Sequence, residues 1–322
     1  MSLIAESRKS PVRPRARAAS EWKPRRAGGL QILESPALAR LAWLVHGFST
    51  RPGGASELPA PGRGSKSKPK RVLNLGFTDW DTRARVTENR ARFFRAIGGE
   101  KMRVVALRQI HSDIAHRVGA QAVTAANAKD ALQGDALMTG DPGVLLVVQT
   151  ADCVPVLFAD TRNRAVAAIH SGWRGTLARI AVKTLGRMKM EFGTEPEDVI
   201  AAIGPAIGRC CYEVGSEVAR DFDAQFRDAR AWFDGPFDAL ASGESDPNWL
   251  PWLTMKPPGH APPPLRVHLD LTAANHALLT DAGVPSSQIS VAGLCTACRP
   301  DLLFSYRREK TTGRLIAAIG IK

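Results

Sequence analysis

The sequence lacks any run of eighteen or more apolar residues, which excludes a membrane-spanning helix. Residues Met1 to Ile4 lead into arginine and proline without the apolar stretch of a signal peptide. Cysteine is also scarce, and its five positions are Cys153, Cys210, Cys211, Cys295 and Cys298. An odd, sparse set does not match the disulfide framework of a secreted protein. We therefore expect a cytoplasmic protein with reduced thiols and no membrane partner, with an organelle transit peptide as the alternative.

Several common catalytic motifs are missing too. The sequence contains no P-loop, no G-x-G-x-x-G and no H-E-x-x-H, so it offers no phosphate loop, dinucleotide fingerprint or zincin helix. It contains no His-x-His pair either, so the copper cluster of a multicopper oxidase has no obvious ligands.

The net charge of +13 invites a nucleic-acid interpretation, but its distribution argues against one. Residues 1–29 hold eight Lys/Arg and two Glu, and residues 52–71 hold five Lys/Arg and one Glu. These two segments, rich in Pro, Gly and Ser, therefore carry +10 of the +13. Such segments are usually solvated and disordered, although they could bind RNA or anionic surfaces weakly. We do not expect a nucleic-acid partner.

The length of 322 residues and the hydrophobic fraction of 44% permit one large domain with a sizeable core. No repeat and no internal boundary are evident. We expect a disordered basic tail over 1–29 and a single domain over 30–322, with inserts near 52–71 and 234–264.

Local patterns predict a mixture of strands and helices. Nearly continuous apolar runs predict strands buried on both faces, and short connections between them favour antiparallel pairing. The sequence thus predicts an α/β (α+β) fold with mixed sheets. The strands are expected at 43–48, 104–107, 144–148, 154–158, 165–169, 199–203 and 315–319, and the helices at 82–97, 176–192, 214–226 and 269–282.

Three segments carry the chemistry: Gln109–His111, Thr150–Cys153 and His170–Gly175, each at the end of a strand-like run. Imidazole and thiolate are the side chains that hold zinc most readily, and three protein ligands leave an open position of the catalytic type. Taken singly, a buried cysteine or a hydrogen-bonded histidine needs no such role. Together they predict a metal or catalytic site. The same atoms also allow a thiol hydrolase with Cys153 as nucleophile, His170 as base, and Asp152 or His111 as orienting group.

The remaining cysteines form a C-x-x-C at 295–298 and a vicinal pair at 210–211. The four could in principle bind a structural zinc, but the vicinal pair lacks the two-residue spacing of a zinc knuckle. We therefore interpret them as structural thiols. Arg51, Arg174 and Arg307 sit beside glycine or polar residues, where a guanidinium suits phosphate or a surface salt bridge equally well.

The chain resembles the laccase-domain family, also called multi-copper polyphenol oxidoreductases or YfiH-type purine nucleoside phosphorylases. The resemblance covers roughly residues 40 to 322. It rests on motifs whose order and spacing agree: HGFSTR (46–51), LNLG (73–76), QIH (109–111), GDAL (134–137), TADC (150–153), AIHSGWRG (168–175), GP (204–205), CYEV (211–214), HLDL (268–271) and FSYRR (304–308).

This resemblance implies a single-domain layered α/β/β/α sandwich and a metal site of His111, Cys153 and His170. It implies zinc rather than copper, and nucleoside and phosphate as substrates. Members are described as phosphorylases of adenosine, inosine and methylthioadenosine and as adenosine deaminases. One is linked to editing of a peptidoglycan precursor, which fits the alternative of a Cys–His hydrolase or amidase. A non-catalytic binding or scaffold protein is the third function class, after the zinc nucleoside enzyme and the Cys–His hydrolase.

The hypothesis assigns roles by proximity to the metal motifs. Asp152 and Cys153 are the expected catalytic residues, with Asp152 as a proton shuttle. The expected substrate-binding residues are Arg51, Asn74, Arg174 and Arg307. The chain departs from the family pattern in three places, and these departures bear mainly on substrate choice. They are the basic tail, a longer loop between Ser56 and Leu73 that lacks the typical Pro-Tyr, and an expanded segment at residues 234–264.

Overall fold

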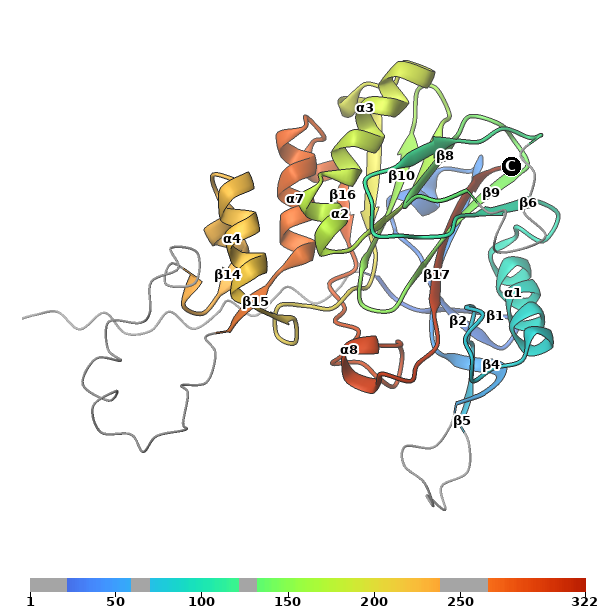
Figure 1. Cartoon of the computed structure of the whole chain (residues 1–322). Coiled ribbons are helices and arrows are strands. Elements are labelled where there is room, and N and C mark those ends of the chain that lie inside the picture. Colours follow the sequence, from blue (N-terminus) through green and yellow to red (C-terminus); the bar gives the residue numbers. More distant parts are fainter. Residues whose placement is uncertain (1–21, 59–69, 122–131, 238–265) are drawn as a thin grey trace, which may run out of the picture.

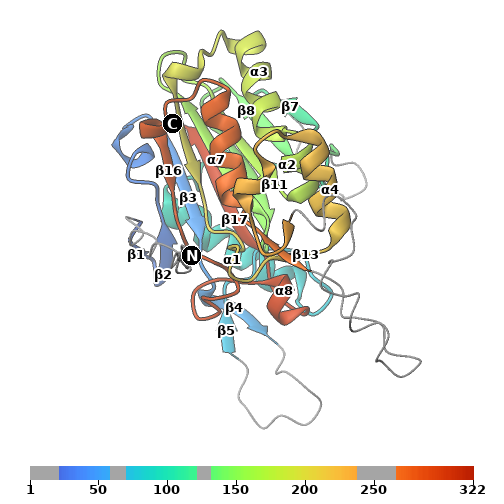
Figure 2. The same cartoon turned by 90° about the vertical axis from the view of Figure 1, so that its left-hand side faces the viewer.

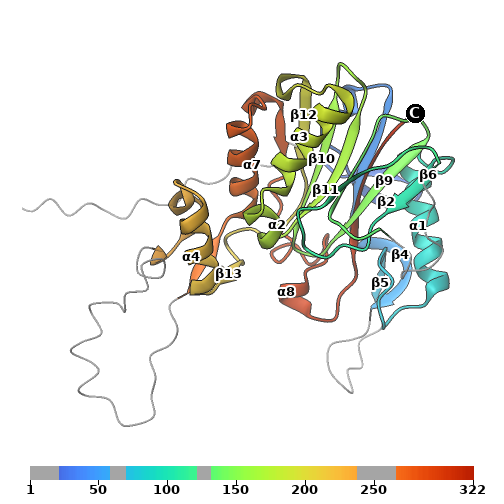
Figure 3. The ribbon, with the colours of Figure 1, turned by 45° about the horizontal axis from the view of Figure 1, so that its top comes forward.

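The computed structural model describes residues 22–58, 70–121, 132–237 and 266–322. Its centre is a pair of stacked six-stranded sheets, with helices on both outer faces (Figure 1). The same four layers are visible when the molecule is viewed from above (Figure 3). This arrangement confirms the expected α/β/β/α sandwich with mixed sheets.

The first sheet is built around a strand from the end of the sequence. Its order is β1 (Arg25–Ala27), β2 (Leu30–Leu33), β3 (Leu44–Ser49), β17 (Leu315–Ile321), β9 (Val144–Thr150) and β6 (Arg103–Ala106). β17 pairs antiparallel with both β3 and β9, whereas β6 pairs parallel with β9. The C-terminal strand therefore joins two otherwise separate parts of this sheet.

The strands next to the predicted metal ligands belong mainly to the second sheet. Its order is β16 (Ile289–Val291), β12 (Val199–Ile203), β10 (Val154–Asp160), β11 (Val166–Ser171), β8 (Ala136–Thr139) and β7 (Ala115–Arg117). β10 pairs antiparallel with both neighbours, as the short connections predicted. The edge pairs β12–β16 and β7–β8 are parallel.

Alternation along the central strands explains their continuous apolar runs. In β10, Val156 and Phe158 pack toward the outer helices, while Leu157 and Ala159 face the other sheet. Both faces are thus removed from water, which is the condition that favours unbroken apolar strands. The core between the sheets also contains Phe48, where β3 lies against the second sheet.

Helix α1 (Arg83–Ile97) covers the outer face of the first sheet with Phe93, Phe94 and Ile97. Both ends of the helix are capped: the Thr82 hydroxyl accepts the amide N–H of Arg85, and Gly98 adopts the left-handed conformation that ends the helix. The second sheet is covered by α2 (Trp173–Leu177), α3 (Ile180–Phe192), α4 (Ser216–Gln225) and α7 (Leu271–Asp281), which face the viewer in Figure 2. A short helix, α8 (Tyr306–Glu309), lies below the sheets.

The prediction of one helix over 176–192 is wrong in detail. The chain instead forms α2 and α3, separated at Arg179, whose φ of 58° is left-handed and cannot continue an α-helix. The Arg179 guanidinium lies over the Phe226 ring, 5.0 Å from its centroid. The first of the two helices, α2, begins directly after the His170-Ser171-Gly172 segment, with Gly172 at its N-cap.

The predicted segment boundaries also need correction. Trp22 is buried, packing on Phe48 with 5.0 Å between ring centroids, so packed structure reaches into the expected tail as far as residue 22. Part of the expected 52–71 loop pairs as a two-stranded sheet, β4 (Pro52–Leu58) with β5 (Lys70–Val72). A further small sheet contains β13 (Glu213–Val214), β15 (Val267–Leu269) and β14 (Phe233–Asp234). Residues 1–21, 59–69 and 238–264 of the predicted segments lie outside the described residues.

The chain crosses between the two sheets where the candidate motifs lie. Residues 151–153 connect β9 of the first sheet to β10 of the second, and residues 107–114 connect β6 to β7. Both crossings therefore place polar side chains where the sheets meet. In the part of the chain that the structure describes, no helix has the length and apolarity to cross a bilayer.

Candidate metal centre and its cavity

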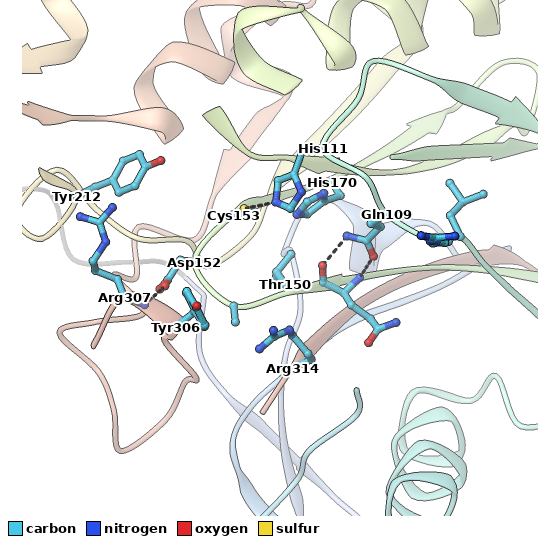
Figure 4. Close-up of a pocket in the computed structure, with 14 residues that line it drawn as sticks. Gln109, His111, Thr150, Asp152, Cys153, His170, Tyr212, Tyr306, Arg307 and Arg314 are labelled. Carbon is cyan, nitrogen blue, oxygen red and sulfur yellow. Dashed lines mark hydrogen bonds between the residues drawn. The ribbon is translucent and has the colours of Figure 1, made fainter. Parts of the chain in front are cut away.

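His111, Cys153 and His170 converge from three separate segments. His111 lies in the β6–β7 crossing, Cys153 ends the β9–β10 crossing, and His170 stands on β11, opposite Pro155 of β10. Their ligand atoms all lie within 4.8 Å of one another, and Cys153 Sγ is 3.9 Å from His111 Nε2. The two imidazole rings are 5.0 Å apart and nearly perpendicular (Figure 4). The predicted triad is thus brought together.

The backbone is specially shaped around this triad. His111 has a φ of 59° and Asp152 a φ of 100°, a region that non-glycine residues rarely adopt and that is often found at functional sites. Gly172 leaves the space that the ligands occupy: a Cβ there would lie 3.0 Å from Cys153 Sγ and 3.1 Å from His111 Cδ2. A glycine is therefore required for the close approach.

Asp135 positions both histidines of the candidate metal centre. Its fully buried carboxylate lies 2.8 Å from His170 Nδ1, and it accepts the backbone N–H groups of Ile110, His111 and Ser112. One side chain therefore fixes the His170 ring and the loop that carries His111. Because Nδ1 is engaged, the Nε2 atom of His170 is the one left for a metal.

The electrostatics couple the three ionisable groups. Burial opposes ionisation of Asp135, but hydrogen bonds from His170 and Ser112 outweigh it and lower its pKa to about 2. Burial likewise opposes protonation of His170, yet Asp135 and Cys153 raise its pKa to about 9. For Cys153, burial is outweighed by hydrogen bonds from His111 and His170, which lower the thiol pKa to about 6. Both shifts favour a thiolate at Cys153 beside an imidazolium at His170.

The donor set fits a transition metal. Two imidazole nitrogens and one readily ionised thiolate are ligands that suit zinc and copper rather than magnesium or calcium. His170 has the carboxylate partner that metal-bound histidines usually have. Three ligands leave one coordination position for water or substrate.

A cavity of about 600 Å³ opens over this centre (Figure 4). It is lined by Leu107, Arg108, Gln109, His111, Gln149, Thr150, Ala151, Asp152, Cys153, His170, Tyr212, Tyr306, Arg307 and Arg314. Cationic and aromatic side chains therefore share a space with the metal ligands.

Two further predicted residues line this cavity. Asp152 is buried, and its carboxylate accepts the Thr296 hydroxyl at 2.6 Å and the backbone N–H of Arg307 at 2.7 Å. The Arg307 guanidinium donates to the carbonyl of Glu213 at 2.6 Å and lies over the Tyr212 ring, 5.1 Å from its centroid. Asp152 and Arg307 are thus held in fixed positions in the cavity wall.

Three predicted substrate-binding residues do not line the cavity. Arg51 is buried, where it forms a 2.7 Å ion pair with Glu309 and donates to the Pro300 carbonyl, so its guanidinium is already engaged. Asn74 is fully buried and accepts the backbone N–H of Arg314 at 3.0 Å. Arg174 is exposed and lies over its neighbour Trp173. Each of these three side chains therefore contacts other partners instead of the cavity.

Sequence reasoning also missed several residues of the site. Tyr212, Tyr306 and Arg314 line the cavity from segments distant in sequence from the metal ligands. Gln109 was visible in the QIH motif, and it exchanges two hydrogen bonds of 2.8 and 2.7 Å with the backbone of Gln149. Asp135 was visible in the GDAL motif but received no role. The signal for it is the β8–β11 pairing, which only the sheet register reveals.

Fold and centre together define a class of protein: a four-layer α/β/β/α protein with a candidate two-histidine, one-cysteine metal centre where its two sheets meet.

The chain belongs to the family described as multi-copper polyphenol oxidoreductase laccase, whose sequence model matches residues 45–322. It is 38% identical over 296 residues to a purine nucleoside phosphorylase of Deinococcus radiodurans, covering 92% of this chain and 94% of that protein. The crystal structure of YlmD from Geobacillus stearothermophilus matches with a TM-score of 0.71 and 31% identity, over 94% of this chain and 99% of that one. The Bacillus licheniformis YfiH structure matches with a TM-score of 0.73 and 29% identity, over 92% and 97%. The family resemblance drawn from the motifs is confirmed.

Proposed function

We propose that this protein is a zinc-dependent purine nucleoside phosphorylase acting on adenosine, inosine or methylthioadenosine. The observation that carries the proposal is the cavity in which His111, Cys153 and His170 face the arginines Arg307 and Arg314. A metal-binding triad opposite cationic side chains suits a substrate pair of nucleoside and phosphate. The relative from D. radiodurans named purine nucleoside phosphorylase supports the same reaction class.

His111, Cys153 and His170 would hold the zinc. The thiolate favours zinc over harder cations, and the missing His-x-His pair argues against a copper cluster. When bound, zinc would supply a Lewis acid and lower the pKa of water in its open position. Asp135 keeps His170 in the tautomer that this binding requires.

Phosphate would be bound by Arg314 and Arg307, with Arg108 at the cavity wall. Guanidinium groups match phosphate oxygens in geometry and charge. Arg314 is half-buried and its backbone N–H is fixed by Asn74, so Asn74 acts on phosphate only through the position of Arg314. This assignment replaces the earlier expectation for Arg51 and Arg174.

The nucleoside would lie against the aromatic side chains. Tyr212 and Tyr306 offer ring surfaces in the same cavity, and aromatic rings bind a purine by stacking. In phosphorolysis an oxygen of hydrogen phosphate forms a bond to the ribose C1′, and the C1′–N9 bond breaks. Its electron pair passes to the purine, which takes up the proton of the hydrogen phosphate.

Asp152 is the proposed carrier of that proton. Its carboxylate lies next to Cys153 and is oriented by Thr296 and by the Arg307 backbone. The same group could serve adenosine deamination, in which water adds at the purine C6 and ammonia leaves. Asp152 would then carry a proton from the water to the departing amino group.

Reduced thiols throughout the chain support a cytoplasmic location.

The test combines metal content with turnover. Wild type and Cys153→Ala are assayed side by side for zinc per chain and for conversion of adenosine plus phosphate, with products separated by chromatography. We expect wild type to form adenine and ribose 1-phosphate and to hold about one equivalent of zinc more than Cys153→Ala, which should show no turnover. Turnover that survives the substitution, or a zinc content equal to that of wild type, would refute the proposal.

A Cys–His hydrolase or amidase, with a peptidoglycan precursor as one candidate substrate, is the second candidate. The observation favouring it is the Asp135–His170–Cys153 arrangement, with a thiol pKa of about 6 beside an imidazole pKa of about 9. Such a thiolate is a competent nucleophile. Asp135, rather than Asp152 or His111, would then be the orienting group. Activity that resists chelators but is abolished by iodoacetamide would establish it in place of the zinc enzyme.

A further inference from the structure

The four cysteines outside the candidate metal centre lie on two turns that follow adjacent strands. The turn with Cys210 and Cys211 follows β12, and the C-x-x-C turn of Cys295 and Cys298 follows β16. β12 and β16 are parallel neighbours, so their carboxyl ends lie at the same edge of the sheet. Ala206 and Cys295 extend this contact as an isolated bridge.

The four sulfur atoms form one cluster. All lie within 4.8 Å of one another, and Cys298 Sγ is 3.5 Å from Cys210 Sγ and 3.4 Å from Cys211 Sγ. In a tetrahedral zinc site, a Zn–S length of about 2.3 Å places the sulfurs about 3.8 Å apart. The cluster therefore has the dimensions of such a site before any ion is added.

The surrounding backbone supports a charged sulfur at Cys295 and fixes the shape of both turns. The N–H of Gly208 donates to Cys295 Sγ at 3.2 Å, which stabilises a thiolate. The C-x-x-C turn is closed by the Arg299 N–H to the Cys295 carbonyl and is held by Arg308, which donates to the Ala297 carbonyl at 2.8 Å. The other turn is closed by the Cys211 N–H to the Gly208 carbonyl. Both turns are thus shaped independently of the sulfurs.

We propose that Cys210, Cys211, Cys295 and Cys298 bind a structural zinc ion, separate from the centre at His111, Cys153 and His170. Four thiolates with no open position define a closed, structural site. Binding would replace the thiol protons, which are released to solvent as the four Zn–S bonds form. The missing two-residue spacing in Cys210–Cys211 is no obstacle, because the turn directs both sulfurs toward Cys298.

This second site would stiffen one wall of the cavity. Thr296, between the two cysteines of the C-x-x-C, donates to Asp152 at 2.6 Å. Tyr212, the residue after Cys211, lines the cavity beneath Arg307. A zinc ion linking the two turns would therefore fix both side chains relative to the candidate metal centre.

The test uses the Cys153→Ala variant of the full chain, purified under reducing conditions. With Cys153 replaced, only the four clustered cysteines remain. We expect about one zinc per chain by elemental mass spectrometry, against about two in wild type and about one in Cys298→Ser. Exchange for Co²⁺ in Cys153→Ala should give the intense sulfur-to-cobalt charge-transfer bands of a tetrathiolate site.

Cys298→Ser in the Cys153→Ala background is the matched control, and it should lose both the zinc and the cobalt bands. If that double variant does not fold, stoichiometric zinc release from Cys153→Ala on titration with a mercurial reagent replaces it. Cys153→Ala that is reduced, folded and free of zinc, without thiolate–cobalt bands, would overturn the proposal. Because this readout needs no turnover, it stands or fails independently of the phosphorylase activity.

Discussion

The Nδ1 atom of His170 lies 2.8 Å from Oδ1 of Asp135, deep in the second sheet. The carboxylate that holds this ring also holds the backbone of His111. Two of the three candidate metal ligands therefore depend on one buried aspartate. Asp135 supports the candidate metal centre although it does not line the cavity.

Asp135→Asn should weaken zinc binding at this centre about 10- to 100-fold. The amide has one acceptor oxygen in place of two, and it carries no negative charge to raise the basicity of His170. A chelator competition titration measures the change. Asp160→Asn is the matched control, because Asp160 is equally buried at the far end of β10 and accepts the amide N–H groups of Arg162 and Asn163. It should lower stability and leave zinc affinity unchanged; equal effects of both variants would contradict the role given to Asp135.

Gly172→Ala should weaken zinc binding about tenfold or more while the fold persists. The added Cβ would lie 3.0 Å from Cys153 Sγ and 3.1 Å from His111 Cδ2, and relieving such overpacking typically costs about 1–3 kcal/mol. Gly186→Ala provides the comparison, because a Cβ on this α3 residue meets nothing within 4 Å. That variant should gain about 0.5–1 kcal/mol of stability with unchanged zinc affinity.

Arg314→Gln should raise the KM for phosphate about tenfold or more, with a smaller change in the KM for nucleoside, because a charge-assisted hydrogen bond contributes about 1.5–3 kcal/mol. Arg51→Gln should instead cost about 3 kcal/mol of folding free energy by leaving Glu309 without its partner. Steady-state kinetics and urea unfolding on both variants separate the roles. A phosphate KM that responds to Arg51 and not to Arg314 would restore the sequence-based assignment.

His46 should make folding sensitive to mild acid. Burial, opposed by Glu34, lowers its pKa to about 4 from an ordinary 6.5, and its Nε2 accepts the Ser35 N–H at 3.0 Å. The unfolded chain therefore binds the proton first, so stability is complete above pH 6.5 and declines as pH falls toward 4. The loss should reach about 2 kcal/mol at pH 5.

Urea unfolding at pH 7.5 and pH 5 measures this loss. His46→Gln, whose amide oxygen can accept the same N–H, serves as the reference. Subtracting its profile removes the contribution of every other titrating group. An identical decline in both proteins would assign the acid sensitivity elsewhere.

The sequence predicted the parts of the fold that depend on local pattern. The ends of α1 follow from Thr82 and Gly98, and β10 and β9 follow from unbroken apolar runs. The break at Arg179 could not be predicted, because an arginine with left-handed φ has no signature in its neighbours. The short strand β1, at the edge of the first sheet, carries charged residues that resemble the tail before it.

The convergence of His111, Cys153 and His170 could be predicted, because histidine and cysteine are chemically distinctive wherever they occur. Arginine is less distinctive, and three arginines were assessed by their sequence neighbours: Arg307 lines the cavity, whereas Arg51 forms an ion pair with Glu309. The vicinal spacing of Cys210–Cys211 argued against a shared site with Cys295–Cys298, although two parallel strands bring the four cysteines together. Such convergence is set by register, which a single sequence does not display.

The order of strands has a consequence for biosynthesis. β17, between β3 and β9, follows every other described strand in the sequence, whereas His111, Asp135, Cys153 and His170 are all translated more than 140 residues before it. The first sheet cannot close on the ribosome until residues 315–321 have emerged. Pairing between such distant segments makes folding slow. During that interval the nascent chain would expose the apolar faces of β3 and β9, so efficient production should depend on chaperones that bind unpaired strands.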